Sequence, residues 1–95
     1  MVTHVHVGFK VDNYERWKEG YDASIGQRKA AGEISFQVFR NVDDPNIVTV
    51  LSVQESAEKV QAFMDSPDLK ERMKAAGITQ MGQMLIIEEM DSGTH

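Results

Sequence analysis

Residues 34–51, ISFQVFRNVDDPNIVTVL, decide the fold of this chain. Two runs rich in β-branched and aromatic residues flank the polar segment 41–46, whose Asn, Asp and Pro residues favour a turn. Pro45 also argues against one continuous central strand, because proline cannot donate a hydrogen bond to the ladder. The stretch therefore predicts a β-hairpin. Outside it the spacing of apolar residues predicts a strand and a helix before the hairpin, and a helix and a strand after it.

The N-terminal side of the hairpin begins with a strand over residues 3–11, in which apolar residues alternate with His4, His6, Gly8 and Lys10. Asp12 or Asn13 is expected to cap the helix that follows, with Glu15 in capping-box register after Asp12. Gly32 is expected to end that helix. Its apolar stripe starts at Tyr14 and becomes polar toward its C-terminal end.

On the C-terminal side, Ser56 is the expected cap of a second helix, which Ser66-Pro67 interrupts. A short continuation is predicted from Pro67 to Ala76, ended by Gly77. The last strand is predicted from about Met81 to Glu89, and residues 91–95 read as a flexible tail.

The order βαββαβ within residues 1–90 predicts a single α+β domain of the ferredoxin-like class, with a four-stranded antiparallel sheet and two helices on one face. The third and fourth strands are apolar on both of their sides, so both sheet faces should be covered. Two helices cover one face only. A homodimer through the sheet faces, closing into a barrel, is the simplest cover for the other.

The amino-acid composition disfavours some classes of partner and excludes some classes of chemistry. The 95 residues include 15 acids and 10 Lys or Arg, a formal net charge of −5, which disfavours nucleic acid and anionic membranes as partners. There is no cysteine, so disulfides and thiolate chemistry are excluded. No leader or 18-residue apolar span is apparent, and cytoplasmic localisation is the default expectation.

Several segments that span nearly the whole chain resemble the dimeric α+β barrel superfamily, in particular its small stand-alone, cyclase-like members. The carrying segments are 10–18 (KVDNYERWK), 28–32 (RKAAG), 37–46 (QVFRNVDDPN), 66–71 (SPDLKE) and 76–77 (AG). The superfamily includes cofactor-independent monooxygenases, polyketide cyclases, muconolactone-type isomerases, haem-degrading enzymes and ligand-sensing domains. Because one fold serves many chemistries, the resemblance implies a choice of functions and not one of them.

Two departures limit what the resemblance implies. Relatives often carry a His late in the first strand and another in the first helix, where this chain has Phe9 and Ser24. The haem-degrading branch uses a helix His as axial ligand, and neither predicted helix here contains one. No cofactor is therefore expected.

His4 and His6 form the first candidate group, on one side of the first strand and about 6.5–7 Å apart along it. Three interpretations are open: an acid–base or ligand-orienting role for His6, two ligands of a metal site, or packing in a dimer interface. No further ligand is obvious beyond Glu88 or His95, so no metal is expected. Ser35 and Gln37 share one face of their strand and would line a wet pocket beside the histidines if the register allows.

The second group lies on the first helix, where Trp17, Tyr21, Ser24 and Arg28 share a stripe. Trp17 and Tyr21 either pack in the hydrophobic core or line a ligand cleft between the sheet and the helices. Arg28 either clamps a carboxylate or enolate or makes a surface ion pair.

The leading hypothesis is a small cofactor-independent enzyme, an isomerase, cyclase or monooxygenase, acting on an enolisable or aromatic metabolite. It assigns catalysis to His6, Tyr21 and Arg28, and ligand binding to the four residues His4, Trp17, Ser24 and Gln37. The alternatives are a non-catalytic small-molecule binding or sensing dimer, and a structural dimer whose barrel is filled.

Overall fold

The computed structural model describes residues 3–95 and contains four strands and four helices. In chain order they are β1 (Thr3–Val11), α1 (Tyr14–Ala23), α2 (Ile25–Ala30), β2 (Glu33–Arg40), β3 (Ile47–Gln54), α3 (Ala57–Met64), α4 (Leu69–Ala75) and β4 (Ile78–Ile87). The predicted β-hairpin is confirmed as β2 and β3, and β1 has the predicted bounds.

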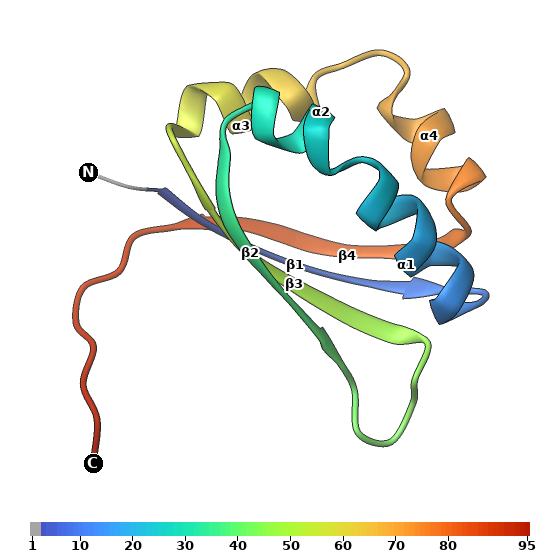
Figure 1. Cartoon of the computed structure of the whole chain (residues 1–95), viewed down its shortest axis with the longest axis horizontal. Helices are drawn as coiled ribbons and strands as arrows, with labels where there is room; N and C mark the ends of the chain where they lie inside the picture. Colours follow the sequence, from blue (N-terminus) through green and yellow to red (C-terminus); the bar gives the residue numbers. More distant parts are fainter. Residues whose placement is uncertain (1–2) are drawn as a thin grey trace.

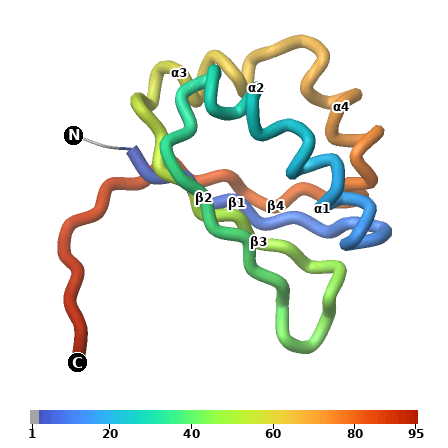
Figure 2. Tube along the Cα trace, viewed as in Figure 1, coloured from blue at the N-terminus to red at the C-terminus, as the bar shows by residue number. Residues whose placement is uncertain are grey.

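The strands form one antiparallel sheet in the order β2-β3-β1-β4, so the first strand is central as the ferredoxin-like topology requires. All four helices lie on one side of this sheet (Figure 1). The predicted α+β fold class is therefore confirmed. After β4 the chain extends away from the body of the domain without helix or strand (Figure 2).

The caps and turns follow from local chemistry. The Asn13 side chain accepts a hydrogen bond from the Arg16 backbone N–H at 3.0 Å, and Ser56 caps α3 in the same way at 3.2 Å. Gly32 and Gly77 follow helices at positive φ, +111° and +88°, where a residue with a Cβ is strained.

The first predicted helix is broken in two, which is the main difference from the sequence prediction, whereas the predicted interruption of the second at Ser66-Pro67 is confirmed. The first breaks at Ser24, whose hydroxyl donates to the Tyr21 carbonyl and so competes with the helical pattern. The continuation after Pro67 begins at Leu69, two residues later than predicted. The last strand begins at Ile78 and ends at Ile87, earlier at both ends than predicted.

The buried core is small and lies between the sheet and α1. Its central cluster consists of one side chain from α1 and four from β1 and β3: Trp17, Phe9, Val11, Val48 and Val50. The Trp17 ring lies 5.2 Å from that of Phe9 and 4.8 Å from that of Tyr21, centroid to centroid. Trp17 is only 4% exposed, so it anchors the helix layer on the sheet.

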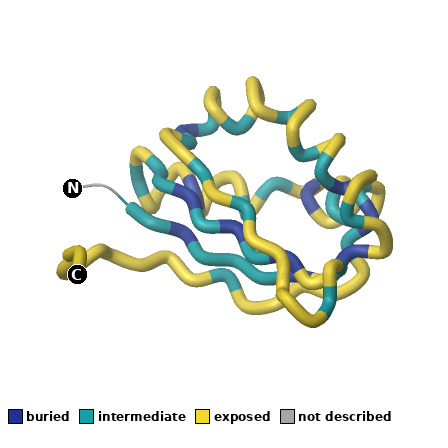
Figure 3. Tube along the Cα trace, turned by 60° about the horizontal axis from the view of Figure 1, so that its bottom comes forward, coloured by how far each residue is buried: buried dark blue, intermediate teal, exposed yellow. Residues whose placement is uncertain are grey.

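The opposite face of the sheet has no cover among the residues that the structure describes. Figure 3 shows the intermediate and exposed residues that interrupt the buried ones along the strands. Four apolar side chains of this helix-free face are 38–45% exposed: Phe39, Ile47, Leu85 and Ile87. No helix over residues 3–95 is long and apolar enough to cross a membrane.

Candidate functional site

The strand register brings the predicted polar residues of β1 and β2 onto the helix-free face. His4 pairs with Val53 and Ile87, and Val53 pairs with Ser35. One row across the sheet is therefore Ser35, Val53, His4 and Ile87. The next row, by the same pairings, is Gln37, Leu51, His6 and Leu85. Polar groups thus lie about 10 Å apart in each row, with an apolar side chain between them.

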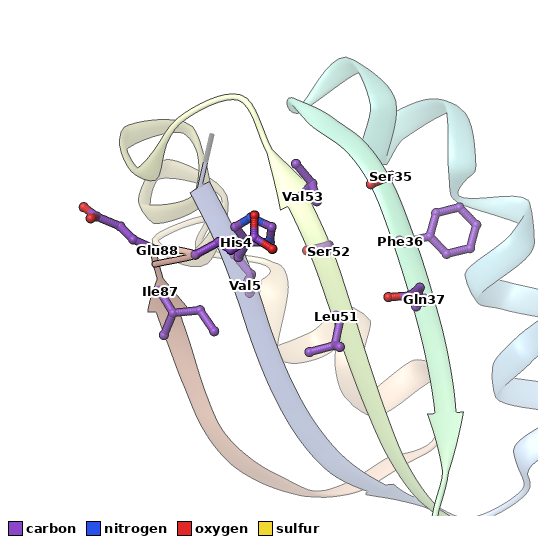
Figure 4. A pocket seen from close by; sticks show the side chains of 11 residues that line it. His4, Val5, Ser35, Phe36, Gln37, Leu51, Ser52, Val53, Ile87 and Glu88 are labelled. Carbon is purple, nitrogen blue, oxygen red and sulfur yellow. The ribbon is translucent and has the colours of Figure 1, made fainter. Parts of the chain in front are cut away.

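A depression with a volume of about 460 Å³ lies at the end of the sheet where β1 begins. His4, Gln37, Leu51 and Ile87 line it, and Figure 4 shows these side chains on the strands with the helices behind them. The rest of its lining is Val5, Ser35, Phe36, Ser52, Val53, Glu88 and Glu89. A concave, largely apolar surface with a few uncharged polar groups suits a small organic ligand.

Both imidazoles in these rows have a nitrogen without a partner. His4 Nε2 and His6 Nδ1 are shielded from solvent and accept or donate no hydrogen bond within the described chain. A neutral imidazole carries its proton on one nitrogen only, and that N–H is stabilised where it can reach a partner. The proton is therefore best placed on the accessible nitrogen, His4 Nδ1 or His6 Nε2. Residues 3–95 contain no cluster of three or more His, Asp or Glu side chains suited to a metal.

The helix side of the sheet carries the second predicted group, held together by Arg28. Its Nη1 donates to Glu33 Oε2 at 2.6 Å, its Nη2 to the Tyr21 carbonyl at 2.9 Å, and its Nε to Ser24 Oγ at 3.1 Å. The guanidinium also lies 3.6 Å from the centre of the Tyr21 ring. Since the Arg28 and Glu33 side chains are only 13% and 8% exposed, they form a buried ion pair. Arg28 is thus occupied in joining α1, α2 and β2.

Tyr21 lies between the rings of Trp17 and Phe36, and its hydroxyl is buried without a partner in the described chain. Burial, together with the negative charges of Glu33 and Asp22, raises the pKa of Tyr21 to about 12, while Arg28 acts in the opposite direction. The phenol is therefore a hydrogen-bond donor at neutral pH and not a base.

The sheet separates the two groups of predicted site residues. His4, His6 and Gln37 lie on the helix-free face, whereas Trp17, Tyr21, Ser24 and Arg28 lie among the helices. A single site containing His6, Tyr21 and Arg28, as predicted, is therefore not formed within one protomer. The depression that His4 and Gln37 line is also on the helix-free face, and not in the expected cleft between sheet and helices.

Sequence reasoning missed Glu33, the partner of Arg28. Glu33 directly follows the helix-ending Gly32 and pairs with Gln54 at the edge of the sheet. The available signal was an acid at the start of a strand five residues after an arginine. That spacing crosses a helix end, however, so helical pairing rules do not cover it.

Comparison with known proteins agrees with this architecture. The sequence profile of the family described as "Antibiotic biosynthesis monooxygenase" matches residues 6–75. A candidate antibiotic biosynthesis monooxygenase from Bordetella bronchiseptica is similar in structure, with a TM-score of 0.78 at 15% identity over 94% of this chain and 97% of that one. SnoaB, a cofactor-independent oxygenase from Streptomyces nogalater, gives 0.71 at 13% identity over 96% and 94%. No curated protein matches the chain.

Proposed function

Because this chain belongs to the antibiotic biosynthesis monooxygenase family, we propose that it is a small cofactor-independent enzyme acting on an enolisable or aromatic metabolite. The observation that carries the proposal is the depression on the helix-free face, where His4 and Gln37 meet an apolar floor. The family supports oxygenation as the first reaction to test, ahead of isomerisation or cyclisation.

The proposed chemistry uses hydrogen bonding and proton transfer by the residues of this face. His6, one row along from the depression, is the proposed proton-transfer group, because imidazole changes its charge near neutral pH. His4, Ser35 and Gln37 are proposed to donate to a ligand oxygen as negative charge develops on it. In this proposal Tyr21 and Arg28 support the sheet from behind and do not touch the ligand.

The same face is the proposed homodimer interface. It carries four exposed apolar side chains, and no acidic side chain lies at its paired positions from β1, β2 or β3. Two copies of a chain with net charge −5 can therefore approach through this face without carboxylates directly opposing each other. The second copy would close the depression from above and exclude water from it.

The dimer is tested by native mass spectrometry and light scattering of Leu51→Lys, with Val42→Lys as the matched control. Leu51 lies at the centre of the helix-free face, whereas Val42 is in the β2–β3 turn and 99% exposed. We expect twice the 10.7 kDa monomer mass for the wild type and the control, and the monomer for Leu51→Lys. A wild-type monomer at micromolar concentration would contradict the interface.

The enzyme is tested with a panel of phenols and 1,3-dicarbonyl compounds, followed by mass spectrometry with and without oxygen. Oxygenation adds oxygen mass only in air, whereas isomerisation proceeds in both conditions. His6→Ala should lower turnover by about 10²–10⁴-fold if it transfers a proton. Unchanged turnover in His6→Ala would remove that role.

A non-catalytic binding dimer is the second candidate, and one observation favours it. Catalytic histidines are usually oriented by a third group, but His4 Nε2 and His6 Nδ1 are buried without a partner in the described chain. Ligand binding that maps to this face with no turnover of any panel compound would support this candidate.

A further inference from the structure

We infer that the depression on the helix-free face takes an uncharged ligand and rejects carboxylates, and that Glu88 and Glu89 determine this selection. The inference rests on the proposed function, because it assigns a substrate class to the same site. The two glutamates have no role in the proposed function, and this charge selection is an additional property of the site.

The first step is the chemistry of the lining. Of its eleven residues, none is Lys or Arg, and Glu88 and Glu89 are its only acids. Its other polar side chains are the hydroxyls of Ser35 and Ser52, the Gln37 amide and the His4 imidazole. Hydroxyl, amide and uncharged imidazole groups can donate to a neutral oxygen, but they supply no full positive charge to balance a carboxylate.

The second step is that, among residues 3–95, no Lys or Arg near the depression is free to enter it. On the helix-free face the one cation at a paired position of β1 is Lys10, six residues from His4 and so about 20 Å along the strand. Its Nζ lies 4.0 Å from Asp44. Arg28 lies on the other side of the sheet, where Glu33 neutralises it.

The third step is the sign of the field at the depression. Glu88 and Glu89 follow Ile87, the end of β4, and neither forms an ion pair in the described chain. A carboxylate in the depression would therefore lie near two like charges at its rim, of which Glu88 points outward (Figure 4), in a chain that is already acidic. Both glutamates are exposed, so salt screens the repulsion, and at low ionic strength we expect it to weaken carboxylate binding by a factor of about ten.

The test uses two probes of nearly the same shape, 2-naphthamide and 2-naphthoate, at pH 7.5 in low salt. Binding is measured by ¹H–¹⁵N chemical-shift titration of the full chain, which also shows whether Leu51 and Val53 respond. For the wild type we expect naphthamide to bind at least tenfold more tightly than naphthoate. Equal affinities, stronger binding of naphthoate, or no binding of either probe would overturn the inference.

Charge reversal at the two glutamates sharpens the test. Glu88→Lys with Glu89→Lys should invert the preference, so that naphthoate binds more tightly. The matched control, Glu19→Lys with Asp43→Lys, makes the same change in net charge at exposed acids that neither line the depression nor form ion pairs. The control should keep the wild-type preference. If both double variants change it equally, net charge is responsible and the assignment to Glu88 and Glu89 is wrong.

These binding results are separable from the proposed function. Turnover without charge discrimination would overturn the inference and leave the enzyme proposal standing. Selective binding of naphthamide with no turnover of any panel compound would support the inference and contradict the enzyme proposal.

Discussion

The two faces of the sheet are built from the same four strands but differ in what covers them. On the helix side, Trp17, Val11 and Val48 are buried, and the one buried ion pair, among residues 3–95, has its partners at 2.6 Å. On the helix-free side, apolar residues are 38–45% exposed and two imidazole nitrogens have no partner. The helix side is packed within one chain, although the buried Tyr21 hydroxyl has no partner among the described residues. The other side has unmet packing and hydrogen bonding, which is where a ligand or a second copy would be accommodated.

The largest expected difference between the faces is in stability. Trp17→Ala should lower the free energy of unfolding by about 3–5 kcal/mol, because it opens a cavity in the only large aromatic cluster of the helix side. Leu85→Ala, on the exposed face, should cost less than about 1 kcal/mol in dilute protein. Urea unfolding measures both.

The same pair of variants tests whether the open face is covered in solution. If a second copy packs on it, the cost of Leu85→Ala should grow with protein concentration, since association stabilises the folded state by mass action. A concentration-independent cost would mean that the face stays uncovered.

The next largest loss of stability is expected when one partner of the Arg28–Glu33 pair is removed. Glu33→Gln leaves the buried guanidinium without its carboxylate and should destabilise the chain by about 3 kcal/mol. The double variant Arg28→Met, Glu33→Leu removes both charges and should recover most of that loss. Chemical denaturation of the three proteins gives the comparison. If Glu33→Gln were as stable as the wild type, the ion pair would not be buried in solution.

The raised pKa of Tyr21 predicts that the protein loses stability in alkali. Its folded pKa, about 12, is above the ordinary value of 10, so the folded state holds its proton more strongly than the unfolded state does. This contribution is fully present below pH 10 and is lost as the pH rises toward 12. In Tyr21→Phe the decline in melting temperature over this range should be shallower. Equal slopes in both proteins would contradict a raised pKa.

The smallest effect is expected at the helix caps, which belong to neither face. Ser56→Ala removes the side-chain acceptor for the Lys59 N–H and should cost about 1 kcal/mol. Ser56→Asp keeps an acceptor and should restore most of it. Thermal unfolding of both variants distinguishes loss of the cap from a general effect of substitution.

Local chemistry explains why so much of the architecture was predictable. The hairpin, the bounds of β1, the capping role of Asn13 or Ser56 and the terminating glycines each depend on residues within a few positions of one another. The break at Ser66-Pro67 was predicted from its local chemistry. The break at Ser24 was not, because the Ser24 hydroxyl accepts from Arg28, which in turn pairs with Glu33 in the next strand.

By itself the sequence determined the order of elements, the ferredoxin-like class and the sets of residues that share a strand face, since alternation and capping act over short distances. Only the tertiary structure decided which face each set occupies. The pairing of His4 with Val53, and of Val53 with Ser35, places Ser35, Gln37 and the histidines together on the helix-free side. The packing of α1 places Tyr21 and Arg28 on the other. Strand register and helix docking join residues distant in sequence, and one residue of slip would exchange the faces.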